Sequence, residues 1–273
     1  MICKYTTVFF FTQAHKMTIV TLTSDFGLQD NYAAKLKGAL LRHCVHLNII
    51  DVTHNIKNYD IVQSAYVVRN MYESFPENTI HIVSVNNFYS PEAAYVLVSH
   101  QGHYFLGPDN GVFSLIFSEQ PKILYKLESK DEVGNLFKLD DIYARAVAHI
   151  ANENPIEDIG EPLASLTERI SLQAIIGPTQ IRGSVIHIDN FENVILNITR
   201  ELWERYSYYR HFALFFKRHD AITTLSTCYS DVPIGETLCQ FNSADHLEIA
   251  INMGKAATMH NLTIDDTVQL DFY

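Results

Sequence analysis

The chain has 273 residues, of which 47% are hydrophobic and 19% charged, so it is long enough to bury one large core or two smaller ones. Its 31 acidic residues outnumber its 20 basic residues, which gives a formal net charge of -11. Because nucleic acids and anionic membranes attract basic surfaces, this charge argues against both as partners. Small molecules and other proteins are the partners that we expect.

The cysteines carry no metal-binding pattern. Cys3, Cys44, Cys228 and Cys239 form no CxxC pair, and no set of His or Cys residues near them matches a zinc site. We interpret them as reduced thiols of a cytoplasmic protein that binds no metal. The chain also has no HExxH, no GxSxG and no phosphate-binding glycine loop, so the hydrolase classes that depend on these motifs have no support.

Residues 1–16 contain one short apolar run, Thr6 to Thr12, which follows Lys4. The run is too short to cross a bilayer and lacks a small-residue cleavage site. We therefore expect residues 1–16 to be a non-native or disordered extension and Met17 to be the functional start. A weak export signal is the alternative.

Strand and helix patterns alternate from Met17 to about residue 173. This alternation predicts an α/β N-terminal domain over residues 17–173 with a mainly parallel sheet. Such sheets bind ligands at the carboxyl ends of their strands. Strands are expected at 18–22, 47–52, 80–85, 94–99 and 104–107, and helices at 30–42, 59–75 and 141–151.

The pattern changes near Gly177-Pro178, after which short alternating apolar runs follow one another almost without helices. Many short strands of this kind predict an all-β barrel domain, which we place over residues 174–273. The expected strands are 182–189, 194–198, 211–216, 221–225, 237–242, 246–252 and 267–272, with one short helix at 199–206.

Asp25 stands where the first strand ends and a glycine-containing loop begins. One carboxylate can accept two hydrogen bonds from a vicinal diol, so a ribose is a suitable ligand for this position. The alternative is that Asp25 only caps the next helix or turn, because Asp is common at such sites. Asp30 and Asp51 have the same two interpretations, and His54 is either a base or ligand or a structural histidine.

The segment Asp189 to Asn193 follows an apolar strand and reads DNFEN. Its aromatic ring suits the face of a nucleobase, and the Asn amide can both donate to and accept from a purine edge. The alternative is an Asx-type turn between two strands. From the residues alone, the turn is the better interpretation.

Several segments in a fixed order resemble one known family. They read LTSDFGLQDNY at 22–32 followed by Lys37-Gly38, DVTHNI at 51–56 with YDI at 59–61, FPENTIH at 75–81, GPDNGVFS at 107–114, IDNFEN at 188–193, Asn197-Ile198, Asn242-Ser243 and LEIAINMGKAA at 247–257. In these segments the chain resembles the S-adenosylmethionine (SAM) hydrolases that form adenosine, also called SAM hydroxide adenosyltransferases, which are related to fluorinases and chlorinases. The segments cover nearly everything after Met17.

The resemblance implies an N-terminal α/β domain and a C-terminal β-barrel domain, assembled as a homotrimer with the adenosyl ligand at a subunit interface. It implies that Asp25 binds the ribose hydroxyls and that Tyr59 faces the ligand. The partner would be SAM or adenosine, with SAM as substrate and no cofactor. The residues placed around the methionine and adenine ends would be Asp189, Phe191, Asn193, Ser243 and Asn252.

The chain departs from the family at the three residues that activate water. Asn86 stands at the position of an Asp, Ala93 at that of an Arg and Lys138 at that of a His. Asn cannot accept a proton as Asp can, Ala93 provides no cation for hydroxide, and Lys138 can act as a base only as a neutral amine. If water is still activated, Lys138, Glu92 or Tyr89 must contribute.

Three hypotheses follow. In the first, the chain cleaves SAM to adenosine and L-methionine by displacement at the ribose C5′ carbon, with altered activation of water. In the second, it has lost the Asp-Arg-His triad and only binds SAM or adenosine. In the third, it is a structural trimer with a collapsed pocket. We rank the first above the second, because families keep their ligand longer than their rate.

Overall fold

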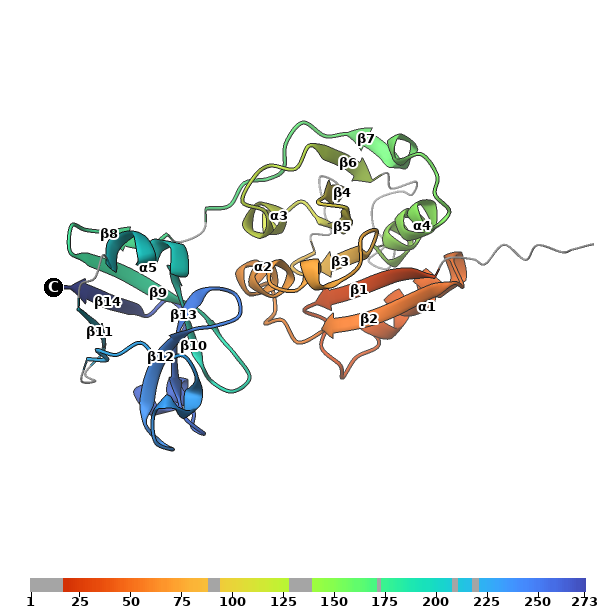
Figure 1. Ribbon diagram of the computed structural model, residues 1–273. Coiled ribbons are helices and arrows are strands. Elements are labelled where there is room, and N and C mark those ends of the chain that lie inside the picture. The colour runs from red at the N-terminus through yellow and green to blue at the C-terminus, as the bar shows by residue number, and fades with distance from the viewer. Residues whose placement is uncertain (1–16, 88–93, 128–138, 171–172, 208–210, 218–220) are drawn as a thin grey trace, which may run out of the picture. The chain divides into compact units, whose positions relative to one another are not determined.

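The computed structural model describes residues 17–87, 94–127, 139–170, 173–207, 211–217 and 221–273. These residues form two compact units (Figure 1). The first contains the described residues up to Asp60, together with Tyr72–Asn110 and Glu119–Leu166. The second contains Thr167–Tyr273 and also two segments from earlier in the chain, Ile61–Met71 and Gly111–Ser118. The predicted domain boundary near residue 173 stays a prediction.

The first unit is built on a seven-stranded sheet in the order β2-β1-β3-β5-β4-β6-β7. The β1 strand pairs in parallel with β2 and β3, and β3 pairs in parallel with β5. The other three pairings, β5 with β4, β4 with β6 and β6 with β7, are antiparallel. The strands are β1 (Thr18–Ser24), β2 (Leu47–Thr53), β3 (Ile80–Ser84), β4 (Tyr95–His100), β5 (His103–Pro108), β6 (Ile123–Leu127) and β7 (Gly160–Pro162).

The sheet is therefore mixed and not mainly parallel as the sequence pattern predicts. The reason lies between β4 and β5, where only Gln101 and Gly102 connect the strands. Both residues have positive φ, 46° and 78°, as the tight turn of a β-hairpin requires. Strands joined by two residues can pair only in antiparallel fashion, because a parallel crossover needs a far longer connection.

Two helices of the first unit, α1 (Tyr32–His43) and α4 (Leu139–Ala151), pack against each other and share one core with the sheet. The core includes Val20 and Ile82 from the strands, Leu36 from α1, and Tyr143 from α4, all at most 1% exposed. The predicted helix over 59–75 is shorter in the structure, because α2 covers only Ile61–Arg69 and is followed by separate 3-10 turn residues Tyr72–Ser74.

The second unit contains a curled, entirely antiparallel sheet. Its strands follow the order β11-β14-β9-β10-β13-β12, and β8 pairs with β9. Closure into a full barrel stays a prediction. The strands are β8 (Ile175–Ile176), β9 (Gln180–Ile188), β10 (Val194–Thr199), β11 (Phe212–Phe216), β12 (Thr237–Phe241), β13 (His246–Ile251) and β14 (Thr267–Phe272), and the helices are α2, α3 (Val112–Ile116), α5 (Arg200–Ser207) and α6 (Ala256–His260).

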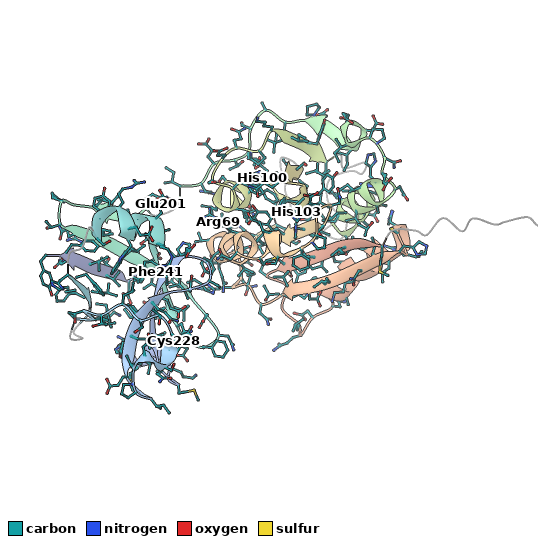
Figure 2. All side chains as sticks on the ribbon, in the orientation of Figure 1. Arg69, His100, His103, Glu201, Cys228 and Phe241 are labelled. Atoms are coloured by element: carbon teal, nitrogen blue, oxygen red, sulfur yellow. The ribbon has the colours of Figure 1, made fainter. Side chains whose placement is uncertain are left out.

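The predicted strand over 221–225 is wrong. Within that segment the structure has only single bridges, from Ile222 to Leu214 and from Leu225 to Cys239. The predicted short helix over 199–206 is confirmed as α5, and it forms because it buries one large residue. Trp203 meets the ring of Phe212 with centroids 4.6 Å apart and that of Phe241, which Figure 2 labels, at 5.7 Å.

No helix in the described part of the chain combines the length and the apolar character that crossing a membrane would need.

A pair of buried histidines links three strands of the first unit. His81 of β3 lies with Nδ1 2.8 Å from Thr21 Oγ1 and with Nε2 3.2 Å from Nδ1 of His103, which Figure 2 labels. The His81 ring also stacks on Phe105, with centroids 4.9 Å apart. Burial, and secondarily the charge of a protonated His103, lowers the pKa of His81 to about 3.

This histidine predicts a loss of stability in acid. Below pH 6.5, the ordinary pKa of histidine, the unfolded chain binds a proton at position 81 that the folded chain refuses until the pH approaches about 3. The free energy of unfolding therefore falls by about 1.4 kcal/mol per pH unit across this window for this one proton. We expect His81→Phe to remove this part of the slope. Urea unfolding from neutral to acid pH measures it, and equal slopes for wild type and variant would contradict the assignment.

Candidate functional site

The candidate site of the first unit lies at the carboxyl ends of β1, β2 and β3. The chain leaves β1 through α1 to reach β2 on one side, and then returns to β3 on the other side of β1. The strand order thus changes direction beside β1 (Figure 1). Open α/β sheets bind their ligands at such a switch point, because the loops after the two neighbouring strands diverge there and leave room.

Asp25, the first residue after β1, holds the loops of this edge together. Its Oδ2 atom accepts the backbone N–H of Tyr59 at 3.0 Å and that of Asn86 at 3.2 Å. Its backbone carbonyl accepts a hydrogen bond from Asn58 Nδ2 at 3.3 Å. One carboxylate oxygen therefore joins the end of β1 to the loops that follow β2 and β3.

The other oxygen of Asp25, Oδ1, has no hydrogen bond to any described residue, and the side chain is half-buried. Asp25 does not cap the next helix, since α1 begins after Asn31 and has no side-chain cap. A carboxylate oxygen has two acceptor positions. The arrangement thus leaves Asp25 able to accept hydrogen bonds from a ligand hydroxyl while its partner oxygen stays bound to the protein.

Both residues that donate to Asp25 have left-handed backbones, with φ of 68° at Tyr59 and 52° at Asn86. Non-glycine residues rarely adopt this conformation, and Asn tolerates it better than most. The carboxyl-edge loop after β3 is held further by Asn110, whose Nδ2 donates to the carbonyls of Val85 at 2.9 Å and of Asn86 at 3.1 Å. Asn110 is only 3% exposed, so this contact is part of the core.

The structure brings together three of the predicted site residues here: Asp25, Tyr59 and Asn86. The Tyr59 side chain is 72% exposed and available for contact. Ala93 and Lys138, the other two positions at which the sequence predicts a replaced triad residue, lie outside the described residues, as do Tyr89 and Glu92. Within the described ranges, no group of three or more His, Cys, Asp or Glu side chains is placed to hold a metal ion.

A second group of predicted residues lies in the loop after β9, in the other unit. Asp189 Oδ1 accepts the backbone N–H of Phe191 at 2.9 Å and of Asn193 at 2.8 Å, and Oδ2 accepts Asn193 Nδ2 at 3.0 Å. Asp189 therefore forms the Asx-type turn that the residues alone favour. The turn leaves the ring of Phe191 73% exposed, so this ring is the part of the loop that is free to stack on a ligand.

Behind this turn lies a buried carboxylate that the sequence interpretation missed. Glu248 of β13 is 3% exposed, and its Oε1 accepts the Tyr229 hydroxyl at 2.8 Å and Gln240 Nε2 at 3.3 Å. The Tyr229 oxygen is 3.5 Å from Asn193 Nδ2, which connects Glu248 to the Asp189 turn. The available signal was a charged residue inside the apolar run LEIAI.

Burial shifts the pKa values of both ionisable groups of this network, Glu248 and Tyr229. It raises the pKa of Glu248, although the hydrogen bond from Tyr229 opposes the shift. It also raises the pKa of Tyr229 to about 12, and the bond to Glu248 adds to that shift. Tyr229 is thus a neutral hydrogen-bond donor at physiological pH.

The remaining predicted residues have simpler surroundings. Asn252 donates from Nδ2 to the carbonyl of Val232 at 2.8 Å, so its amide holds the loop before β12. Ser243 is exposed.

Two family models match most of the chain. Residues 20–160 match the model of the SAM hydroxide adenosyltransferase N-terminal domain, and residues 183–269 match that of the C-terminal domain. The chain belongs to this family. The Asp25 edge falls in the first matched segment and the Asp189 turn in the second, so both groups of candidate residues lie inside the family's domains.

Named relatives cover nearly the whole chain. A protein named (R)-S-adenosyl-L-methionine hydrolase from Methanocaldococcus jannaschii is 28% identical over 93% of this chain and 96% of its own length. One of the same name from Thermus thermophilus is 27% identical over 88% and 94%. A fluorinase from Nocardia brasiliensis is 23% identical over 92% and 96%.

The fold is also found in solved structures. That of an uncharacterized conserved protein from Thermotoga maritima superposes with a TM-score of 0.82 at 25% identity, covering 93% of this chain and 99% of the other. A conserved hypothetical protein from Thermus thermophilus gives a TM-score of 0.74, also at 25% identity.

We expect Asp25→Ala to destabilise the first unit, because the backbone N–H groups of Tyr59 and Asn86 lose their acceptor. The expected loss in free energy of unfolding is about 1–3 kcal/mol, near the lower value because water reaches this edge. Asp30→Ala is the matched control, since Asp30 is exposed and has no hydrogen bond to a described residue; it should change stability by less than about 0.5 kcal/mol. Urea unfolding measures both, and an equal loss for the two variants would refute the role of Asp25.

Glu248→Gln tests the buried carboxylate. Because the folded state raises the pKa of Glu248, the unfolded chain ionises first, and folding loses stability as the pH rises through 4.5, the ordinary value. The Gln variant lacks this loss and can still accept from Tyr229. We therefore expect the stability of the wild type, relative to the variant, to fall between acid and neutral pH. A difference that stays constant with pH would contradict the raised pKa.

Proposed function

We propose that this protein cleaves SAM at the ribose C5′ carbon and releases adenosine and L-methionine. The observation that carries the proposal is the Asp25 carboxylate, which the amides of Tyr59 and Asn86 hold at the switch point of the sheet and whose Oδ1 is unbound among the described residues. The family and its relatives named SAM hydrolase support the same substrate.

In this proposal Asp25 accepts hydrogen bonds from the ribose hydroxyls and thereby orients C5′. A carboxylate is suited to this role because hydrogen bonds from hydroxyl donors to a charged acceptor are short and strong. Phe191 and Tyr59 supply exposed aromatic rings, and Asn193, Ser243 and Asn252 supply polar groups for the adenine and methionine ends. The finer architecture, a closed barrel and a homotrimer with the ligand at a subunit interface, belongs to the same proposal.

The reaction is a single displacement. The oxygen of a water molecule forms a bond to C5′ while the bond from C5′ to sulfur breaks, and the electron pair of that bond stays on sulfur, so methionine leaves as a neutral thioether. The attacking water loses one proton to solvent or to a base. The sulfonium is already a good leaving group, so alignment and exclusion of bulk water account for most of the acceleration, and no cofactor is needed.

Asn86 is the position at which we propose that activation of the attacking water is altered in this chain. Its backbone N–H still donates to Asp25, but its neutral side chain cannot accept the proton of the attacking water. We therefore propose slow cleavage in which Asn86 orients water and does not deprotonate it. In the same terms, Ala93 provides no cation, and Lys138 would have to act as a neutral amine.

Incubation of the purified protein with SAM, followed by chromatography of adenosine and methionine, tests the proposal. We expect equal amounts of both products above the buffer rate. Asp25→Ala should lower kcat/KM by roughly 10–100-fold, which corresponds to one charge-assisted hydrogen bond. Asp30→Ala should match the wild type. Heat of SAM binding without product would instead identify a binder, and neither heat nor product would end the proposal.

A second variant tests the role of position 86. We expect Asn86→Asp to raise kcat with little change in KM, because it restores a proton acceptor without removing the backbone bond to Asp25. Asn87→Asp is the matched control, because it adds the same charge at the neighbouring position, where the side chain binds Ser84 Oγ. An equal effect of the two variants would show that added charge alone changes the rate.

A further inference from the structure

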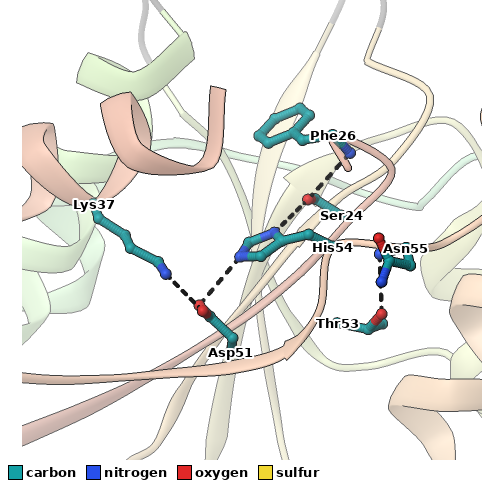
Figure 3. A network of polar contacts seen from close by, with 7 residues as sticks. All are labelled: Ser24, Phe26, Lys37, Asp51, Thr53, His54 and Asn55. Carbon is teal, nitrogen blue, oxygen red and sulfur yellow. Dashed lines mark hydrogen bonds and ion pairs between the residues drawn. The ribbon is translucent and has the colours of Figure 1, made fainter. Parts of the chain in front are cut away.

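A chain of polar contacts runs from the protein surface to the residue before Asp25 (Figure 3). Lys37 Nζ of α1 lies 2.6 Å from Asp51 Oδ2, and His54 Nε2 lies 3.1 Å from Asp51 Oδ1. On its other side, His54 Nδ1 lies 2.7 Å from Ser24 Oγ. The outer residues Lys37 and Asp51 are partly exposed, whereas His54 and Ser24 are 2% and 1% exposed.

The surroundings of His54 determine how its ring is used. The Asp51 carboxylate beside Nε2 favours a proton on that nitrogen, so we assign Nδ1 as the acceptor of the Ser24 hydroxyl. The contact to Asp51 is at ion-pair distance but is not an aligned hydrogen bond, since Nε2 has no partner with hydrogen-bond geometry among the described residues. Asp51 therefore orients the ring mainly through its charge. Although burial opposes it, the hydrogen bond from Lys37 and the nearby His54 hold the pKa of Asp51 below its ordinary value, so the carboxylate stays charged.

His54 also holds the backbone on both sides of Asp25. Its side chain binds Ser24, directly before Asp25, and its carbonyl accepts the N–H of Gly27 at 2.7 Å. Ser24 Oγ in turn accepts the N–H of Phe26 at 3.3 Å. The turn that carries the Asp25 carboxylate is thus held at Ser24 by the His54 imidazole, at Phe26 by the Ser24 hydroxyl and at Gly27 by the backbone carbonyl of His54.

The burial of Ser24 and His54 is not compatible with a direct chemical role for these polar contacts. Ser24, His54 and Asp51 are the residue types of a nucleophilic triad, but a hydroxyl that is 1% exposed cannot reach a substrate. The His54 ring is equally enclosed. The arrangement can therefore act only through the residues that it holds.

We propose that His54 is a positioning residue that orients the Asp25 carboxylate through Ser24, and that it thereby sets the preference of the site for a ribose with both hydroxyls. This inference rests on the proposed role of Asp25 as the ribose ligand. It assigns the buried histidine of the DVTHNI segment a part in recognising the sugar.

The test compares adenosine with 2′-deoxyadenosine, which lacks one hydroxyl of the diol. Calorimetry of the full chain gives the two dissociation constants. The dissociation constant of 2′-deoxyadenosine divided by that of adenosine measures recognition of the diol. For the wild type we expect a ratio of roughly 10 or more, as expected for a hydrogen bond to a charged group. His54→Ala should lower that ratio about fivefold, because adenosine loses more of its binding than 2′-deoxyadenosine, which has only one hydroxyl of the diol to lose. A merely structural defect would weaken both ligands together.

Replacing His54 by Asn or by Gln shows which of its two side-chain contacts, to Ser24 or to Asp51, sets the ratio. Asn places its amide near the position of Nδ1, so His54→Asn should keep the contact to Ser24 and restore much of the ratio. Gln reaches toward Asp51 instead, so His54→Gln should behave like His54→Ala. Ser24→Ala removes a single oxygen and should also lower the ratio, while Lys37→Met, at the exposed end, should leave it unchanged because partly exposed ion pairs contribute little.

The outcomes separate the two proposals. If the wild type binds both nucleosides equally or binds neither, the role of Asp25 in holding the diol fails and this inference falls with it, whereas the SAM cleavage assay decides the proposed function separately. If the wild type prefers adenosine but the ratio is unaffected in His54→Ala and Ser24→Ala, only the inference is overturned. Melting temperatures without ligand identify any variant that does not fold, and Ser24→Ala, the smallest change, then decides the question.

Discussion

One carboxylate oxygen organises the carboxyl edge of the first sheet. Asp25 Oδ2 accepts two backbone N–H groups, from Tyr59 after β2 and from Asn86 after β3. Both donors have left-handed backbones, which cost energy and persist only where surrounding contacts hold them. The bonds therefore fix two strained loops to the end of β1 and at the same time hold the carboxylate in one orientation. Because Oδ1 has no bond to a described residue, the constraint that closes the edge also presents an acceptor to a ligand.

In the second unit an Asp carboxylate also accepts several backbone N–H groups, but both of its oxygens are bound within the turn. Asp189 also collects backbone N–H groups, from Phe191 and Asn193, but its second oxygen is bound to the Asn193 amide. Both oxygens thus take part in the turn, and the exposed Phe191 ring is what the loop offers to its surroundings. Asp25 is the stronger candidate for a ligand contact through its carboxylate, and Asp189 acts first by shaping the loop.

Position 86 separates two tasks that one residue can perform. The structural task uses the backbone N–H, which any residue except proline has, and the chemical task uses the side chain. A change from Asp to Asn leaves the first intact and removes a proton acceptor from the second. In the proposed function, this chain therefore keeps the backbone contact of position 86 and lacks its proton acceptor, so we expect it to differ from its relatives in rate and not in ligand.

The sequence by itself determined the order of most strands and helices, the residues that carry the family resemblance, and the location of Asp25 at a strand end. These properties are local, because they depend on periodicity, on Gly and Pro positions and on short motifs. The short gap between the expected strands 94–99 and 104–107 already indicated a hairpin, so the mixed sheet was within reach of the sequence, whereas the single bridges of 221–225 were not. The pairing of Asp25 with amides 34 and 61 positions away, and of His54 with Ser24 30 positions away, was decided only by the tertiary structure. Such contacts join residues whose spacing along the chain carries no periodic signal, and they exist only once the carboxyl ends of three strands meet at one edge of the sheet.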